Sequence, residues 1–341
     1  MRVTIRDVAI RAGVSVATVS RAFNNTAPVN TITRQRVFDS ASALRYLPNL
    51  AARSLITRRT HTVGILIPDL HGEFFSEIMR GVDQVANQHG YHLLVTNSHG
   101  DRDAAEVATS NMRGRVDGLI LMAPEMDGDS LARVVPDHIP VIMINSPVDL
   151  AGRDSLRVDN FQGAHDMVGH LIAHGHTRIA LLRGSDVNND AVERVRGYRS
   201  ALVDAGLEAP LELQIAGDFT ESGGFAGALR LLGLSHPPTA IFASNDSMAI
   251  GALSALRERG VRVPDDVAVV GFDDIPIAAY LTPTLASVRV RISDLGARAC
   301  AQLLHAIKHE NQHEPIHEVI PTELIPRQSC GCQDSVEEKV Q

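Results

Sequence analysis

Short apolar runs alternate with amphipathic segments along the chain from residue 62 onward. Runs of four or five apolar residues are typical of strands buried in a parallel sheet, and the segments between them have helical spacing. A first series predicts strands at 63–67, 92–95, 118–122 and 141–144 and helices near 73–89, 103–114 and 128–137. A second series predicts strands at 179–182, 240–242 and 267–270 and helices near 160–174, 190–206, 221–234 and 246–260. The pattern therefore predicts an α/β body of two lobes, each a doubly wound parallel sheet, that face each other across a cleft.

The first 45 residues show helical spacing only, with two short helices predicted within 5–24 and a third from about 32 to 45. Thr4 and Ser15 suit helix starts, where a side-chain oxygen satisfies free N–H groups, and Gly13 suits the left-handed residue of a tight turn. Ala9, Gly13 and Val19 have the spacing of a helix-turn-helix unit. The apolar residues predicted to form its core are Val8, Val14, Val19, Ala22, Val37, Phe38, Ala41 and Leu44.

Charge divides the chain at about the same place. Residues 1–60 contain ten arginines against two aspartates, a net charge of +8, whereas the remaining residues contain 22 Lys and Arg against 38 Asp and Glu, a net charge of −16. A basic head on an acidic body indicates a module that faces phosphates, joined to a domain with another task.

The N-terminal motifs resemble the headpiece of the lactose-repressor (LacI/GalR) family of bacterial transcription regulators. The matching positions are residues 4–9, 12–15 and 18–21, then Val29, Thr33, Arg34, Val37 and residues 46–49. The resemblance continues over essentially the whole chain. It implies a three-helix helix-turn-helix headpiece and hinge, followed by a periplasmic-binding-protein-like body. It also implies a homodimeric repressor that binds double-stranded operator DNA, is controlled by a small-molecule effector and acts in the cytoplasm.

This resemblance places the expected boundaries. Residues 1–47 form the headpiece, 48–60 the hinge helix and linker, 61–160 the first lobe, 161–290 the second lobe and 327–341 a C-terminal tail. The helix near 292–309 and a strand near 317–325 return to the first lobe, which is completed by about 291–322. Because the tail has no sustained heptad, we expect a dimer and not a tetramer.

The second helix of the headpiece predicts how DNA is read. Val16 and Ala17 offer small apolar surfaces to thymine methyl groups, and Arg21 can form two hydrogen bonds to a guanine edge. The further residues expected at the DNA are Thr4, Ser15, Thr18, Ser20 and Asn24. Residues 49–55 alone predict a linker or a helix too short to be stable in water. In the resembling family they form a hinge helix on operator DNA, which assigns Asn49, Ala52 and Leu55 to the minor groove, with Leu55 as a wedge.

Ligands of open α/β sheets sit beyond the carboxyl ends of the strands. The residues expected there to bind the effector are Asp69, Phe74, Phe75, Asn145, Asp159, Asn188, Arg194, Phe219, Asn245 and Asp273, with His71 and Asp190 nearby. Carboxylates, amides and a guanidinium bind hydroxyl groups, and aromatic faces cover sugar C–H groups or a base. Arg194, Asn245, Asp273 and the three phenylalanines match effector positions of the resembling family.

These residues favour a sugar or sugar derivative as the effector, with a nucleobase or nucleoside co-repressor as the alternative. Asn188 stands where the similar purine-binding repressor has arginine, and Val290 stands where several sugar-binding relatives have glutamine.

Other chemistry finds less support in the sequence. His170 and His174 are spaced to hold a metal, and Cys330 and Cys332 form a thiol pair, but each pair lacks partners in sequence, so no metal site is expected. No phosphate-binding glycine loop and no nucleophile elbow occur, which favours a protein without cofactor or catalysis. A solute-binding receptor is a remote alternative, because the N-terminus lacks a signal-peptide pattern and no apolar stretch is long enough to span a membrane.

Overall fold

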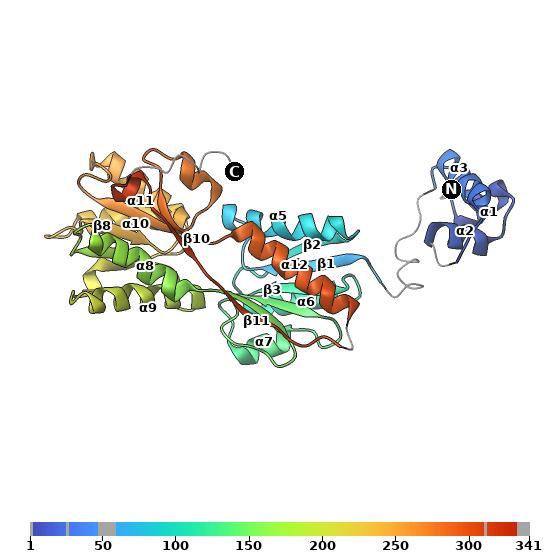
Figure 1. The fold of residues 1–341 in the computed structure, drawn as a ribbon, viewed down its shortest axis with the longest axis horizontal. Coiled ribbons are helices and arrows are strands. Elements are labelled where there is room, and N and C mark those ends of the chain that lie inside the picture. Colours follow the sequence, from blue (N-terminus) through green and yellow to red (C-terminus); the bar gives the residue numbers. More distant parts are fainter. Residues whose placement is uncertain (1–2, 25–26, 47–58, 310–311, 333–341) are drawn as a thin grey trace. The chain divides into compact units, whose positions relative to one another are not determined.

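The computed structural model describes residues 3–24, 27–46, 59–309 and 312–332 of the 341-residue chain. The chain divides into two compact units at residue 61, which we call the headpiece and the body. The ribbon in Figure 1 shows the helical headpiece and the two-lobed α/β body. No helix in the described ranges is long and apolar enough to cross a membrane.

The headpiece contains helices α1 (Ile5–Ala12), α2 (Val16–Asn24) and α3 (Thr31–Ala43). Thr4 is the N-cap of α1, and its backbone N–H donates to the Asp7 carboxylate over 2.8 Å. Ser15 starts α2 by accepting the backbone N–H of Thr18 over 3.1 Å. Between these helices Gly13 has φ +63°, in the left-handed region that the turn requires. These contacts explain why the chain reverses within three residues.

Small side chains fill the headpiece core. Its buried members are Val8, Ala9, Ala12, Val19, Ala22, Val37 and Ala41. Phe38, which the helical spacing predicted as a core residue, is instead 38% exposed and packs edge-to-face on Phe23 with ring centroids 5.2 Å apart. Three short helices enclose too small a volume for every apolar residue of α3, so Phe38 lies at the rim.

The first lobe of the body contains a fully parallel sheet in the order β11-β5-β4-β3-β1-β2. Its strands are β1 (Thr62–Ile67), β2 (His92–Asn97), β3 (Gly118–Met122), β4 (Val141–Ile144), β5 (Asp154–Val158) and β11 (His317–Ile320). Helices α5 (Glu73–Gln88) and α12 (Ile292–Lys308) cover one face, and α6 (Arg102–Met112) and α7 (Gly128–Val134) cover the other. Alternate residues of β1 therefore enter different apolar clusters, with Ile65 on the α5 side and Leu66 on the α6 side.

The second lobe repeats this design in the order β12-β10-β9-β8-β6-β7, with β12 antiparallel at one edge. Its strands are β6 (Ile179–Arg183), β7 (Gln214–Ala216), β8 (Ala240–Ala243), β9 (Ala268–Asp273), β10 (Ala286–Arg289) and β12 (Glu323–Ile325). Helices α8 (Asn160–Ala173) and α9 (Asn189–Asp204) cover one face, and α10 (Glu221–Leu232) and α11 (Asp246–Glu258) cover the other. Short 3-10 turns are η1 (Leu211–Leu213), η2 (Pro276–Tyr280) and η3 (Gln328–Cys330).

In the described residues the chain passes between the lobes after β5, after β10 and between β11 and β12 (Figure 1). The sequence pattern predicted one strand near 317–325, but the structure has two, because β11 joins the first sheet and β12 the second. The pattern did not predict the short strands β5, β7 and β10. These three passages between the lobes place the carboxyl ends of the strands of both sheets around a shared cleft.

Candidate functional site: the interlobe cleft and the exposed face of α2

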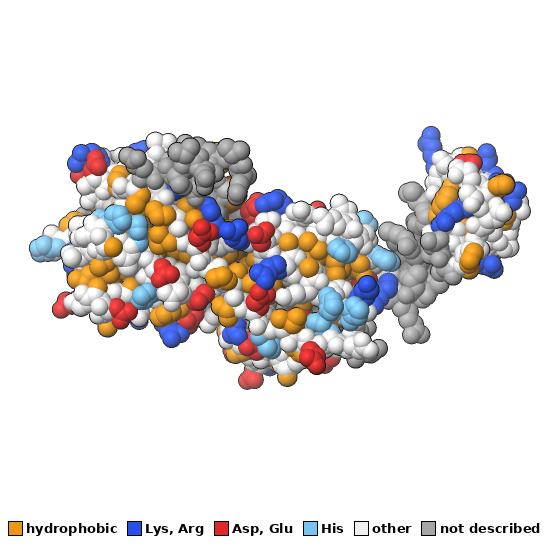
Figure 2. Space-filling view, in the orientation of Figure 1, with side chains coloured by type: hydrophobic (Ala, Val, Ile, Leu, Met, Phe, Trp, Pro, Cys, Tyr) orange, Lys and Arg blue, Asp and Glu red, His pale blue; other side chains and the backbone are white. Residues whose placement is uncertain are grey.

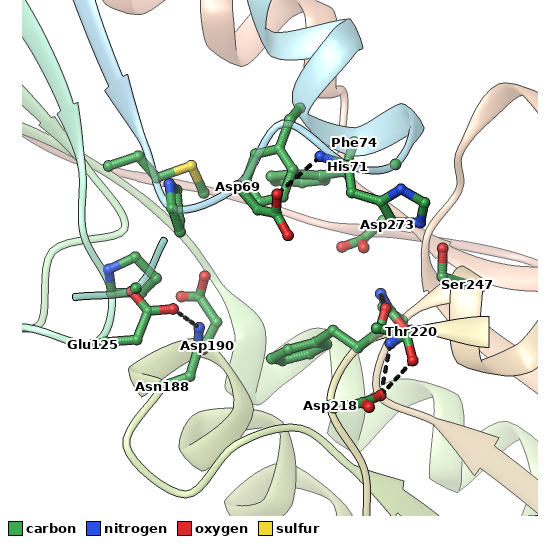
Figure 3. A pocket seen from close by; sticks show the side chains of 18 of the residues that line it. Asp69, His71, Phe74, Glu125, Asn188, Asp190, Asp218, Thr220, Ser247 and Asp273 are labelled. Atoms are coloured by element: carbon green, nitrogen blue, oxygen red, sulfur yellow. Dashed lines mark hydrogen bonds between the residues drawn. The ribbon is translucent and has the colours of Figure 1, made fainter. Parts of the chain in front are cut away.

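A cavity of about 270 Å³ lies between the two lobes. This volume is just below the usual range for ligand pockets, about 300–1,000 Å³, and suits a ligand of sugar size. Figure 3 shows Asp69, His71 and Phe74 of the first lobe on one side and Asn188, Asp190 and Thr220 of the second lobe on the other. The eight predicted effector residues that line the cavity are Asp69, Phe74, Phe75, Asn188, Arg194, Phe219, Asn245 and Asp273.

Asn145 and Asp159 do not line the cavity. The buried Asn145 amide donates to Asp190 over 2.8 Å and accepts the backbone N–H of Val158 over 3.0 Å, so it supports a lining residue from behind. Asp159 is the N-cap of α8 and accepts the backbone N–H of Gln162 over 3.0 Å. Both side chains are thus engaged in supporting contacts outside the cavity lining.

Arg194 is the centre of a buried polar network and is only 4% exposed. Its Nε donates to Asn160 over 2.8 Å, one terminal nitrogen donates to the Ser244 carbonyl, and the other donates to Asp273 over 3.3 Å. The guanidinium also lies 3.8 Å from the centroid of the Phe272 ring. Each nitrogen of this side chain therefore has a protein partner. Arg194 thus stabilises the cavity wall and does not present a free pair of N–H groups to a ligand.

Burial raises the pKa of two lining carboxyl groups. The pKa of Asp273 rises to about 7 because the group is removed from water, against the opposing charge of Arg194. The pKa of Asp190 rises to about 6 for the same reason, although Arg194 and the amides of Asn145 and Asn160 favour the charged form. Behind them, burial and the nearby Asp273 raise the pKa of Asp246 well above its ordinary value. Because several buried carboxyl groups share one guanidinium, some of these carboxyl groups remain protonated near neutral pH.

Backbone strain is concentrated at the same strand ends. Phe219 has φ +66° and Asp273 has φ +105°, and both line the cavity. Asn145, which supports Asp190, has φ +52°. Residues with side chains rarely adopt positive φ, and such strain persists where the surrounding structure fixes it, often at binding sites. The strain marks these loops as a functional region independently of their chemistry.

Several lining residues were not predicted, namely Glu73, His99, Glu125, Asp218, Thr220 and Ser247. Glu125 follows β3 and accepts the side-chain amide of Asn188 across the cleft over 3.0 Å. Its position beyond a carboxyl strand end was a usable signal. Asp218 accepts the hydroxyl of Thr220 over 2.7 Å and so shapes the loop that carries Phe219. That loop follows strand β7, which the sequence pattern did not predict, so the loop could not be placed at the carboxyl end of a strand.

On the headpiece, α2 presents the residues expected at DNA to solvent. Val16 is 41% exposed, and Ala17 and Arg21 are exposed, whereas Val19 is buried in the core. Ser15 and Thr18 are occupied in part by the N-terminal cap of α2, Thr4 caps α1, and Ser20 is half-buried. The Asn24 side chain and residues Asn49, Ala52 and Leu55 lie outside the described part of the structure. In Figure 2 basic side chains predominate on the visible face of the headpiece, and both charge signs mix on the body.

Comparison with known proteins decides the family. Residues 4–49 match the family described as bacterial regulatory proteins, lacI family, and residues 168–330 match a periplasmic binding protein-like domain. The chain is 38% identical to the ribose operon repressor of Escherichia coli (strain K12) over 309 residues, covering 89% of this chain and 93% of that protein. The chain belongs to the lacI family of bacterial regulatory proteins.

Solved structures agree with this assignment. The lac repressor dimer bound to operator and the anti-inducer ONPF is similar with a TM-score of 0.86 and 28% identity, covering 97% of this chain and 99% of that one. A complex of the transcriptional regulator CelR with cellobiose has a TM-score of 0.72 and 32% identity, covering 96% and 100%. This lacI-family member is therefore a transcriptional regulator with a DNA-binding helix-turn-helix headpiece and a periplasmic-binding-protein-like body.

Proposed function

We propose that this regulator is a repressor that binds a palindromic operator as a homodimer and is controlled by an uncharged sugar bound in the interlobe cleft. The similar lac repressor is a dimer on operator DNA, and the similar CelR binds cellobiose. The observation that carries the choice of ligand is the charge of the cavity lining together with the engagement of Arg194. The proposed place of action is the cytoplasm, where a repressor meets its operator.

The lining contains many acids and a single arginine. Its carboxyl side chains are Asp69, Glu73, Glu125, Asp190, Asp218 and Asp273. Arg194 is the one guanidinium among the described lining residues, and its nitrogens already donate to Asn160, Ser244 and Asp273. A phosphate or carboxylate on the ligand would meet this acidic wall without a free bidentate partner. Neutral hydroxyl groups, in contrast, can donate to the carboxylates.

The aromatic lining supports the same ligand class. Phe74, Phe75 and Phe219 provide apolar faces beside the acidic groups, and Phe74 and Phe75 meet edge-to-face with centroids 5.4 Å apart. Apolar faces that cover C–H groups and polar groups that bind hydroxyls are the two requirements of a sugar site. A nucleobase would use the same faces, so nucleosides belong in the test.

Lobe closure provides the link to DNA. The cleft is bridged by the Asn188 amide donating to Glu125 over 3.0 Å, by the Asn145 amide donating to Asp190 over 2.8 Å and by the backbone N–H of Asn189 donating to the Pro124 carbonyl over 3.0 Å. A ligand that adds contacts to both lobes favours one lobe arrangement over another. By linkage, ligand and operator then change each other's affinity by the same factor, typically corresponding to about 1–3 kcal/mol.

A thermal-shift screen with matched ligand pairs tests the proposal. The full chain is heated with ribose, glucose and cellobiose, with the 5- or 6-phosphates of the first two, and with adenosine and guanosine. We expect a neutral sugar to raise the unfolding midpoint and its phosphate to have no effect. A shift produced only by a phosphorylated sugar or by a nucleoside would contradict the ligand assignment.

The ligand found in this way is then added to a gel-retardation titration with operator fragments selected from random DNA. We expect the selected sites to be palindromic and the sugar to change the apparent operator affinity by about fivefold or more, from the coupling energy above. We also expect the sugar to be recovered unchanged, because a control domain needs binding alone. Turnover of the sugar, or binding by single headpieces to non-palindromic sites, would refute the respective part of the proposal.

A further inference from the structure

Two histidines and two cysteines that lie about 160 positions apart in sequence meet on the outer face of the second lobe. His170 Nε2 lies 3.4 Å from Cys330 Sγ and 3.8 Å from Cys332 Sγ, and His174 Nε2 lies 3.5 Å from Cys332 Sγ. The ligand atoms of His170, Cys330 and Cys332 all lie within 4.8 Å of one another. Figure 2 shows histidine side chains gathered on the body surface over α8.

These distances fit the edges of a metal tetrahedron. Zinc–sulfur bonds of about 2.3 Å and zinc–nitrogen bonds of about 2.0–2.1 Å give nitrogen–sulfur edges of about 3.5 Å in tetrahedral geometry. The three nitrogen–sulfur distances of 3.4, 3.5 and 3.8 Å bracket that edge. We propose a structural zinc site in the second lobe held by the mutually close His170, Cys330 and Cys332, with His174, which reaches Cys332, completing the tetrahedron as the fourth ligand.

The cysteine side of the site is held rigidly by the fold. The buried Ser329 hydroxyl donates to the Val269 carbonyl over 2.6 Å, and the buried Arg327 donates to Asp274 over 2.7 Å. Gly331 lies between the two cysteines and has φ +90°, in the left-handed region. The backbone N–H groups of Cys330 and Cys332 both donate to the Arg327 carbonyl, over 3.2 and 3.3 Å. The turn therefore fixes the two cysteines on one carbonyl with their sulfur atoms close together.

The histidine side lies at the C-terminal end of α8. His170 and His174 are one helical turn apart, and their ring centroids are 4.2 Å apart. His174 Nδ1 lies 2.9 Å from the His170 carbonyl. Donation of the Nδ1 proton to that carbonyl leaves Nε2 with a free lone pair toward Cys332, as metal-binding histidines require.

Metal binding balances in charge and protons. Without metal the Cys330 thiol donates to the Arg327 carbonyl over 3.1 Å. Zinc displaces one proton from each thiol, so two thiolates and two neutral imidazoles surround a divalent ion and the site is neutral overall. No oxidant or reductant is needed. The ion would join the C-terminal segment to α8 within one lobe, away from the ligand cavity.

Metal analysis of the full chain, purified in reductant without a histidine tag, tests the site. We expect about one zinc ion per chain after exhaustive dialysis, and loss of that zinc in Cys332→Ser and His170→Asn. The matched controls are Cys300→Ala, which removes the buried cysteine of α12, and His165→Asn, which removes another histidine of α8. Both controls should retain the metal.

Cobalt supplies a readout that does not depend on variant folding. After chelator treatment, Co²⁺ added to the wild-type chain should produce thiolate-to-metal charge transfer and the strong visible bands of a tetrahedral site, and Zn²⁺ should bleach both. Zn²⁺ should also raise the unfolding midpoint of the wild type but not of Cys332→Ser. Wild-type protein without stoichiometric zinc, cobalt bands that persist in Cys332→Ser, or a Cys330–Cys332 disulfide in freshly isolated protein would overturn the assignment.

Discussion

On α2 of the headpiece, Val16, Ala17 and Arg21 face solvent, while in the cleft Arg194 and Asp273 are at most 5% exposed and bound to each other. The α2 surface can be read by a partner without any change in the headpiece core, since that core uses other residues. The cleft residues, in contrast, hold each other in place and form the cavity wall. Substitutions in the headpiece should therefore change recognition alone, whereas substitutions in the cleft should change recognition and stability together.

Arg194→Ala gives the largest expected effect and tests the cleft half of this comparison. The substitution leaves the buried carboxyl groups of Asp190 and Asp273 without their cation, so the free energy of unfolding should fall by about 3–5 kcal/mol, as for broken buried ion pairs. Ligand affinity should fall at least tenfold, because Asp190 and Asp273, which line the cavity, lose the cation that positions them. Denaturant unfolding and ligand titration measure the two effects.

The control for that variant is Arg196→Ala on the same helix. Arg196 is exposed, pairs with Glu193 one turn away and lies 5.5 Å from the centroid of the Phe161 ring. An exposed ion pair of this kind is worth at most about 1 kcal/mol. Operator affinity without ligand should stay near the wild-type value in both variants. If Arg194→Ala unfolded and bound ligand like Arg196→Ala, the buried network would not have the role given to it.

Arg21→Ala tests the headpiece half. We expect a loss of about 1–3 kcal/mol in operator binding and relaxed preference at a single base pair in each half-site, because a guanine contact specifies sequence. Arg36→Ala, another exposed arginine of the headpiece, should leave base preference unchanged. Thermal unfolding of both variants should match the wild type. Selection from a randomised operator measures preference, and a uniform loss over all sequences for Arg21→Ala would assign Arg21 to phosphate.

The two regions were also unequally predictable from sequence. In the headpiece, the turn glycine, the helix caps and the exposed face of α2 follow from local sequence spacing. Gly13, Ser15 and Val16 could therefore be placed before the structure was known. Most cleft residues could be assigned to the cavity because strand order puts carboxyl ends together. Their partners could not be assigned, since the contact of Asn145 with Asp190 depends on side-chain direction across 45 positions.

What local patterns missed has physical causes. Strand β5 begins with Asp154 and Ser155, which are buried but polar, so no apolar run marked it. Phe38 has core spacing in a unit with too little core to receive it. The histidine and cysteine pairs near α8 and η3 each lacked partners locally, and only the fold brings them together.

Gly184→Ala perturbs the cleft without changing a polar group. A methyl group at this position would lie 2.1 Å from the Phe219 ring, so the ring must move from the cavity wall. We expect ligand affinity to fall by about five- to tenfold, a loss of about 1–1.4 kcal/mol at the low end of the cost of overpacking. Gly169→Ala within α8 meets no atom within 4 Å and should stabilise the protein by up to about 1 kcal/mol with unchanged affinity. Equal affinities for the two variants would remove Phe219 from the binding wall.

Asp273→Asn shows how burial ties the cleft to stability through pH. Because the pKa of Asp273 is raised to about 7 in the folded state and is near 3.8 in the unfolded chain, the native state holds an extra proton between these values. The free energy of unfolding contributed by this group is therefore fully present below about pH 4 and is lost as pH rises to about 7, at up to about 1.4 kcal/mol per pH unit.

Asparagine resembles the protonated acid and has no such dependence. The variant should thus gain stability relative to the wild type between pH 5 and pH 7, and the difference should level off by pH 8. Guanidinium unfolding of both proteins without ligand, at pH 5, 6, 7 and 8, measures that difference. The exposed control Asp265→Asn, whose contact with Arg262 lies on the surface, should show no trend over this range. A stability difference that declines from pH 5 to pH 7 would mean that Asp273 is held as the charged partner of Arg194 throughout, and the protonated cleft acid would have to be Asp190 or Asp246.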